Sequence, residues 1–202
     1  MLKIGFRAAV ACICAAAILS GLLGGCSREK DISEEGYRED VSAQDLQEAV
    51  AEELGEEYWP NAEIPAETLK EVYGISEELY EEASARMPLI SAHVDTLIIL
   101  RAKEGKEEMI REALEAYRAY QAESAVQYPM NLGKIQAAEV KRFGRYVCFV
   151  QLGGDIAEPS EESDEAVIAH CREENARALA VDRKSTRLNS SHTSKSRMPS
   201  SA

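Results

Sequence analysis

The chain has 202 residues, with 23 Lys and Arg against 36 Asp and Glu, which gives a formal net charge of −13 at pH 7. Residues 27–181 alone carry 16 basic and 35 acidic side chains, a net charge of −19. Such a chain lacks the surplus of Lys and Arg that neutralises phosphate, so nucleic acid is excluded as a partner. The length between the two ends suffices for one domain with one hydrophobic core.

The N-terminal segment has the pattern of a bacterial lipoprotein signal peptide. Lys3 and Arg7 precede an apolar run over residues 8–23, and Leu23-Gly24-Gly25-Cys26 closes it. A helix over that run would reach roughly 24 Å, short of the ~30 Å hydrocarbon core of a bilayer. We therefore predict a signal peptide at residues 1–25, lipid attachment at Cys26 and a position on the extracytoplasmic face of the cell membrane. The alternatives are an uncleaved helix and an ordinary secretory signal.

The other end of the chain differs in composition from everything before it. Nine of the eighteen residues from Ser185 to Ala202 are Ser or Thr, and the stretch shows no apolar period. Residues 183–192 also resemble translated adapter or vector sequence. We expect residues 182–202 to form a disordered, non-native tail, with a genuine basic tail as the alternative. An acidic tether is predicted at residues 26–41, which leaves a single domain at residues 42–181.

The first half of this domain is predicted to be helical. Ser42 begins a capping sequence, and the helix after it should end near Leu54, with Gly55 as its stop. Tyr58-Trp59-Pro60 is then expected to be extended, because the residue before a proline disfavours the helical region. A short second helix starts at Pro65, and a third is predicted from Ser76 to the residue before Pro88.

The second half carries the regular pattern of strands and helices. Residues 94–102 are apolar and β-branched, as in a buried strand, and residues 106–123 form an amphipathic helix. Two strands over residues 134–142 and 146–152 make a hairpin, and residues 161–180 form a final helix. The predicted fold is α+β: N-terminal helices, then β-α-β-β-α, with helices packed on a small antiparallel or mixed sheet. This order is close to a ferredoxin-like unit without its last strand.

Several short motifs support a resemblance to a known family. Together with the motif at Cys26, they resemble a family of short lipoproteins from Gram-positive gut anaerobes that is catalogued only as a domain of unknown function. The resemblance spans most of residues 45–181. It implies a location in the cell envelope and brings no activity, cofactor or catalytic residue. The motifs are Glu56-Glu57-Tyr58-Trp59-Pro60, Met87-Pro88-Leu89-Ile90, Val94-Asp95-Thr96-Leu97, Gln127-Tyr128-Pro129-Met130 and the run over residues 146–154.

Candidates for chemistry each have a simpler structural interpretation. Gly153-Gly154 follows a strand, where backbone amides bind phosphate in other proteins, but acidic side chains crowd the next helix and favour turn glycines. His170 and Cys171 are neighbours on a helix and point about 100° apart, so they cannot meet at one site. With His93 and Cys148 they are the only residues that could form a soft-metal or thiol site. The sequence leaves open whether Cys148 and Cys171 form a disulfide. The sequence therefore predicts no metal site and no cofactor.

The aromatic residues in irregular segments are the best candidates for binding. Trp59, Tyr58 and Tyr128 lie where a rigid scaffold commonly places recognition residues, although they also suit a role in plugging the sheet. We predict a non-enzymatic binding or assembly module that contacts an envelope protein or wall component. The alternative is an envelope enzyme whose site uses scattered carboxylates such as Asp95, Glu139 and Asp155.

Overall fold

The computed structural model describes residues 37–187, apart from residues 39, 91, 125 and 155–163. The predicted signal peptide, the lipid attachment residue Cys26 and residues 188–202 of the predicted tail lie outside the described residues. Within the described part, the fold is α+β, with five α-helices, one short 3₁₀ helix and five strands.

A five-stranded antiparallel sheet forms the centre of the domain. Its strands are β1 (Ala62–Glu63), β2 (Tyr80–Met87), β3 (Thr96–Ala102), β4 (Glu139–Phe143) and β5 (Tyr146–Gln151), in the spatial order β1-β2-β3-β5-β4. The pairing of β3 with β5 sets Thr96 opposite Gln151 at one end and Arg101 opposite Tyr146 at the other. Strands β3 and β5 are apolar along almost their whole length because helices cover both of their faces.

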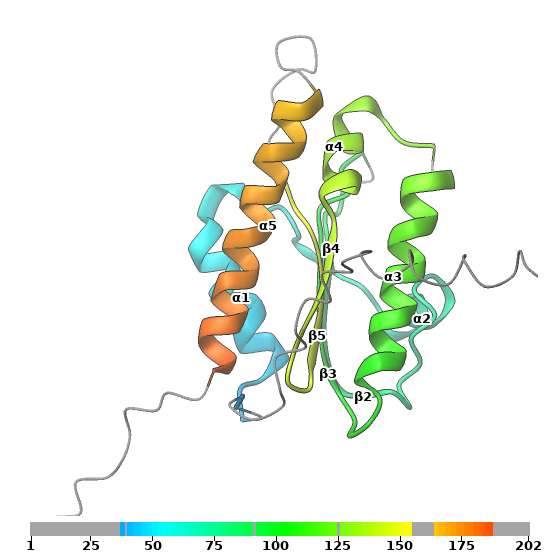
Figure 1. The fold of residues 1–202 in the computed structure, drawn as a ribbon, viewed down its shortest axis with the longest axis vertical. Coiled ribbons are helices and arrows are strands. Elements are labelled where there is room, and N and C mark those ends of the chain that lie inside the picture. The colour runs from blue at the N-terminus through cyan, green and yellow to red at the C-terminus, as the bar shows by residue number, and fades with distance from the viewer. Residues whose placement is uncertain (1–36, 39, 91, 125, 155–163, 188–202) are drawn as a thin grey trace, which may run out of the picture. The chain divides into compact units, whose positions relative to one another are not determined.

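Figure 1 shows the sheet nearly edge-on, with helices on both sides. On one face lie α1 (Ala43–Leu54) and α5 (Asp164–Thr186), whose Leu46 and Leu179 pack with Leu97 and Ile99 of β3. On the other face lie α2 (Ala66–Glu71) and α3 (Glu107–Ser124), whose apolar side chains pack with the alternate residues of the same strands. The remaining helix, α4 (Pro129–Ala137), packs mainly on α5.

Four predicted features are confirmed, with small shifts in the bounds of the helices and strands. The Ser42 hydroxyl accepts a hydrogen bond from the Asp45 backbone N–H at 2.9 Å, and the helix that it caps ends at Leu54 as predicted. The buried strand after Val94 is β3, and the long amphipathic helix is α3. The predicted hairpin turn at Gly144 joins β4 to β5, with a positive φ of 58° that favours glycine.

The prediction of a helix from Ser76 to the residue before Pro88 is wrong, because most of this segment is strand β2. Its Glu- and Ala-rich sequence has a high helix propensity, and its apolar and polar residues alternate only weakly. A bulge between Tyr80 and Glu82 also shifts the pairing register with β3. Pairing of this segment with the whole length of β3 stabilises the strand by more than local helix propensity favours a helix. β2 also occupies the place beside β3 where the missing last strand of a ferredoxin-like unit would lie.

The prediction of a strand over residues 134–142 is wrong in its first half. Pro129 stands at the first position of α4, and the helix continues through Lys134 to Ala137 before β4 begins at Glu139. The fold also departs from the ferredoxin-like pattern because α3 and α5 cover opposite faces of the sheet. The final helix extends past its predicted end at Ala180 to Thr186, which is buried.

Candidate functional site

The structure places the three aromatic residues predicted for binding in different settings. Trp59 is half-buried, and its indole ring lies 4.3 Å from the imidazole ring of His93, centroid to centroid, at a tilt of 37°. Tyr128 is exposed and precedes the first residue of α4. His93 therefore covers one side of the only tryptophan in the chain.

Tyr58 serves the interior of the domain. Its ring packs against the cluster between α1, α5 and the sheet, and its hydroxyl accepts a hydrogen bond from Gln47 Nε2 at 2.5 Å. Burial raises the pKa of the Tyr58 hydroxyl, and the hydrogen bond from Gln47 opposes that shift. A phenol held in this way contributes to packing and leaves little of its face for a ligand.

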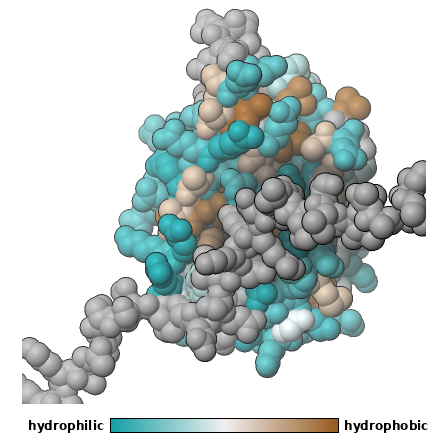
Figure 2. Space-filling view, in the orientation of Figure 1, coloured by the Kyte–Doolittle hydropathy of each residue, from teal (hydrophilic) through white to brown (hydrophobic). Residues whose placement is uncertain are grey.

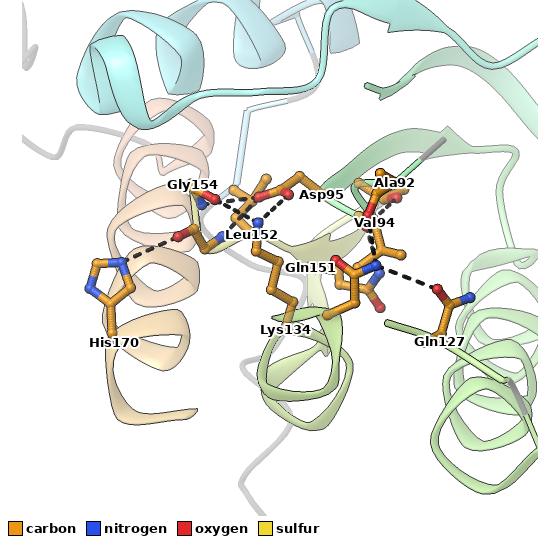
Figure 3. A network of polar contacts seen from close by, with 12 residues as sticks. Ala92, Val94, Asp95, Gln127, Lys134, Gln151, Leu152, Gly154 and His170 are labelled. Atoms are coloured by element: carbon orange, nitrogen blue, oxygen red, sulfur yellow. Dashed lines mark hydrogen bonds and ion pairs between the residues drawn. The ribbon is translucent and has the colours of Figure 1, made fainter. Parts of the chain in front are cut away.

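A buried ion pair lies at the end of the sheet where β3 begins and β5 ends (Figure 3). Lys134 Nζ lies 2.5 Å from Asp95 Oδ2 and donates a second hydrogen bond to the Gly154 carbonyl at 2.6 Å. Asp95 Oδ1 accepts hydrogen bonds from the backbone N–H groups of Gly153 and Gly154, at 3.0 and 3.1 Å. The Asp95 side chain is fully buried and that of Lys134 almost so, so the two charges depend on each other and on these backbone groups.

The two glycines after β5 are required by close contacts. Gly154 has a φ of +57°, and a Cβ there would collide with the Glu57 carboxylate. A Cβ on Gly153 would come within 2.8 Å of Cys171 Sγ and 3.0 Å of Lys134 Cε. These glycines act as turn residues, as the sequence favours, and they also allow the Lys134 side chain to reach Asp95.

More side chains hold the backbone around the ion pair. Each binds a main-chain group of a neighbouring segment, so β3, β5, α4 and α5 are joined at this end of the domain. The contacts are Gln151 Nε2 to Val94 O at 2.6 Å, Asn131 Nδ2 to Ala92 O at 2.9 Å, Asn175 Nδ2 to Ala137 O at 2.8 Å, Leu152 N to Asn175 Oδ1 at 2.9 Å, and His170 Nε2 with Gly153 O at 3.2 Å.

The histidines and cysteines considered as soft ligands lie in separate settings. Cys148 and Cys171 are both free, buried thiols, so the structure has no disulfide between them. His93 lies against Trp59 and His170 contacts a backbone carbonyl, and the described residues include no group of three or more His, Cys, Asp or Glu that suits a metal ion. Burial raises the pKa of the Cys171 thiol to about 11, which makes it a poor nucleophile.

The carboxylates of the predicted enzyme alternative have separate partners. Asp95 belongs to the buried ion pair, and Glu139 lies on β4 with its carboxylate 3.6 Å from Lys141 Nζ. Asp155 falls outside the described residues. Asp95 and Glu139, the two of these carboxylates that the structure describes, are therefore engaged in two different ion pairs.

Asp182 is a buried carboxyl group that the sequence prediction missed. Burial raises the pKa of Asp182 to about 7, and the Cys148 thiol beside it lowers that value only in part. Neither oxygen has a hydrogen-bond partner of normal geometry among the described residues. The signal was present in the sequence, because Asp182 continues the buried face of α5 formed by Cys171, Asn175 and Ala178.

A cleft of about 810 Å³ lies between α1 and α5. Its walls carry charges of both signs, and Arg177 already pairs with Glu174 at 2.8 Å and approaches Glu53 at 3.9 Å. The basic residues Lys184 and Arg187 in its wall come from the segment whose sequence resembles vector-derived sequence. The lining residues are Arg38, Ala49, Glu52, Glu53, Arg177, Ala180, Val181, Lys184, Ser185 and Arg187.

Comparison with known proteins gives a family-model match over part of the chain. Residues 53–152 match a family model that is described as a domain of unknown function, DUF4358. The matched segment runs from the last residues of α1 to the end of β5 and contains both Asp95 and Lys134. Among curated proteins and solved structures, no significant match to the chain is found. The chain thus carries a domain of unknown function, DUF4358, in residues 53–152.

Proposed function

We propose that this protein is a lipid-anchored, extracytoplasmic binding or assembly module of the bacterial cell envelope. The observation that carries the proposal is the motif Leu23-Gly24-Gly25-Cys26 at the end of an apolar segment too short to span a bilayer. Cys26 is the residue that accepts the lipid, and two acyl chains hold a protein at a membrane far better than one. Among the described residues, no helix has the length and apolar character to cross a membrane.

The state of the buried polar groups supports a non-enzymatic role. Asp95 would be the natural general base of a carboxylate site, but its side chain is fully buried and accepts hydrogen bonds from Lys134, Gly153 and Gly154. A general base must reach the proton that it abstracts, and this carboxylate faces the protein's own backbone. The network stabilises the end of the sheet, where it would support a recognition surface.

The test is metabolic labelling of the full-length chain with palmitate in a bacterial host. Wild type and Cys14→Ser should both be labelled, because Cys14 lies inside the predicted signal peptide. Cys26→Ser should take up no label and accumulate as a longer precursor. A wild-type chain that takes up no label under these conditions would remove the basis of the proposed location.

A further inference from the structure

Exposed apolar side chains gather at the end of the domain that holds the buried ion pair. We name this set the apical surface: Leu89, Ile90, Val126, Tyr128 and Leu132. Leu89 is 81% exposed and Val126 is 99% exposed, which is unusual for side chains of this kind. Figure 2 shows hydrophobic residues at the end of the domain where α4 lies.

The backbone beneath the apical surface is held in place by hydrogen bonds. The Leu89 N–H donates to Asn61 Oδ1 at 2.8 Å, and the His93 N–H donates to the Ile90 carbonyl at 3.2 Å. Asn131, on α4 beside Leu132, donates from its side chain to the Ala92 carbonyl at 2.9 Å. The connection between β2 and β3 and the start of α4 are therefore joined, and a prearranged apolar surface loses little entropy on binding.

The charged residues at this end of the domain are mainly acidic. Exposed carboxylates stand near the end of α1, at the end of α3 and at the start of α5, in the residues Glu56, Glu123, Asp164 and Glu165. The half-buried Glu57 carboxylate lies beside Gly154. Lys134 is almost fully buried against Asp95, so its charge is not offered to a partner. Electrostatic complementarity favours a partner that carries basic residues beside its apolar residues.

The chain enters the folded unit at the opposite end of the sheet. Tyr37, the first described residue, pairs with Arg187, and its ring lies 6.3 Å from that of Phe143, beside the β4–β5 turn. The apical surface lies at the Thr96 and Gln151 end of β3 and β5. The six paired residues between these ends span about 20 Å. The segment that leads from Cys26 therefore joins the folded unit at the end away from the apical surface.

We propose that the apical surface docks an apolar, positively charged segment of a second envelope protein. This inference rests on the proposed function for its cellular location, whereas the surface itself is a property of the folded unit. A net charge of −19 over residues 27–181 disfavours a second copy of the same chain and an anionic membrane. The surface consists mainly of aliphatic side chains, which suit an apolar protein segment better than a sugar ring.

The probe for this docking is a fluorescein-labelled helical peptide with Leu on one face and Lys on the other. It is titrated against the full-length chain in zwitterionic lipid nanodiscs, with empty nanodiscs as the reference. If the palmitate test shows no lipid, the same titration is run in buffer, so failure of the anchor and failure of the docking surface are separate results. Fluorescence anisotropy measures the affinity at low and high salt.

The variant Leu89→Ser with Ile90→Ser should weaken peptide binding at least roughly tenfold, because two apolar anchors are lost. Val72→Ser is the matched control, since Val72 is an aliphatic residue of 54% exposure next to α2. It should leave the affinity unchanged, and both variants should keep the wild-type melting temperature. Glu56→Gln with Glu57→Gln should weaken binding mainly at low salt.

Three results would overturn the proposal. Equal peptide affinity of the wild type and the Leu89→Ser, Ile90→Ser variant would show that the apical surface does not bind the probe. Sedimentation velocity that shows a dimer of the wild type, lost in this variant, would assign the surface to a second copy of the chain. Displacement of the peptide by a chitin oligosaccharide would assign it to a wall glycan.

Discussion

Lys134 Nζ lies 2.5 Å from Asp95 Oδ2, and the two side chains are almost completely buried between α4 and the start of β3. Each charge is compensated by the other and by backbone groups of Gly153 and Gly154. A buried pair of this kind contributes little net stability over an apolar pair, but the loss of one partner leaves an uncompensated charge in the interior. The pair therefore ties the correct placement of α4 to the end of β5.

The first prediction concerns this pair. Lys134→Met should lower the free energy of unfolding by about 3 to 5 kcal/mol, because Asp95 is left charged and buried. The double variant with Asp95→Asn should recover part of the loss. Lys141→Met is the control, since the Lys141–Glu139 pair is longer and half-exposed, and it should cost less than about 1 kcal/mol. Urea unfolding measures all four proteins, and similar losses for Lys134→Met and Lys141→Met would contradict the role of the buried pair.

The second prediction is a pH dependence that arises from Asp182. Burial raises the pKa of this carboxyl from an ordinary 3.8 to about 7, so the folded state holds the proton more tightly than the unfolded state does. This contribution to stability is complete below pH 3.8 and declines as the pH rises to about 7. The decline amounts to at most about 4 kcal/mol.

Asp182→Asn isolates that contribution from other carboxylates, such as Glu81 and Glu108, whose pKa values are lowered by Arg145 and Arg111. The variant should be more stable than the wild type at pH 8 and should match it more closely at pH 5. Urea midpoints at the two pH values provide the measurement. A difference between the two proteins that does not change with pH would show that Asp182 does not titrate in this range.

The third prediction uses the only tryptophan in the chain. His93→Ala should shift the fluorescence emission of Trp59 to longer wavelength, because the imidazole that lies 4.3 Å from the indole no longer shields it. His170→Ala is the control, since His170 lies on α5 and contacts the Gly153 carbonyl. The Trp59 emission of this variant should stay that of the wild type. An unchanged spectrum in His93→Ala would show that the two rings do not stack in solution.

The fourth prediction compares two glycines with positive φ. Gly105 has a φ of +74° and open space around a Cβ, so Gly105→Ala should cost about 1 kcal/mol for the backbone conformation alone. Gly154→Ala carries the same backbone cost and also displaces the Glu57 carboxylate, so its loss of stability should be larger by about 1 kcal/mol or more. Thermal unfolding measures both variants. Equal losses would show that Glu57 moves away without cost.

Elements with strong local signals were predicted well from the sequence. The hydroxyl of Ser42 and the glycine at 55 mark the two ends of α1, and both signals depend only on neighbouring residues. The apolar run of β3 and the glycine turn at Gly144 are also local, and both are found where predicted. The settings of the candidate binding residues could not be predicted from local patterns, because the contact of Trp59 with His93 and the packing of Tyr58 against the interior join segments that are distant in sequence.

What the sequence determined by itself is therefore the α+β class, the acidic character, the capped helix, the central strand and the hairpin, since each follows from a short-range pattern. Only the tertiary structure decided that residues 80–87 form a strand, that Lys134 belongs to a helix and that Asp95 is its partner. The physical reason is that helix propensity differs by less than about 1 kcal/mol per residue among ordinary side chains. Pairing along a buried strand, or the burial of a charge against its counter-charge, outweighs differences of that size.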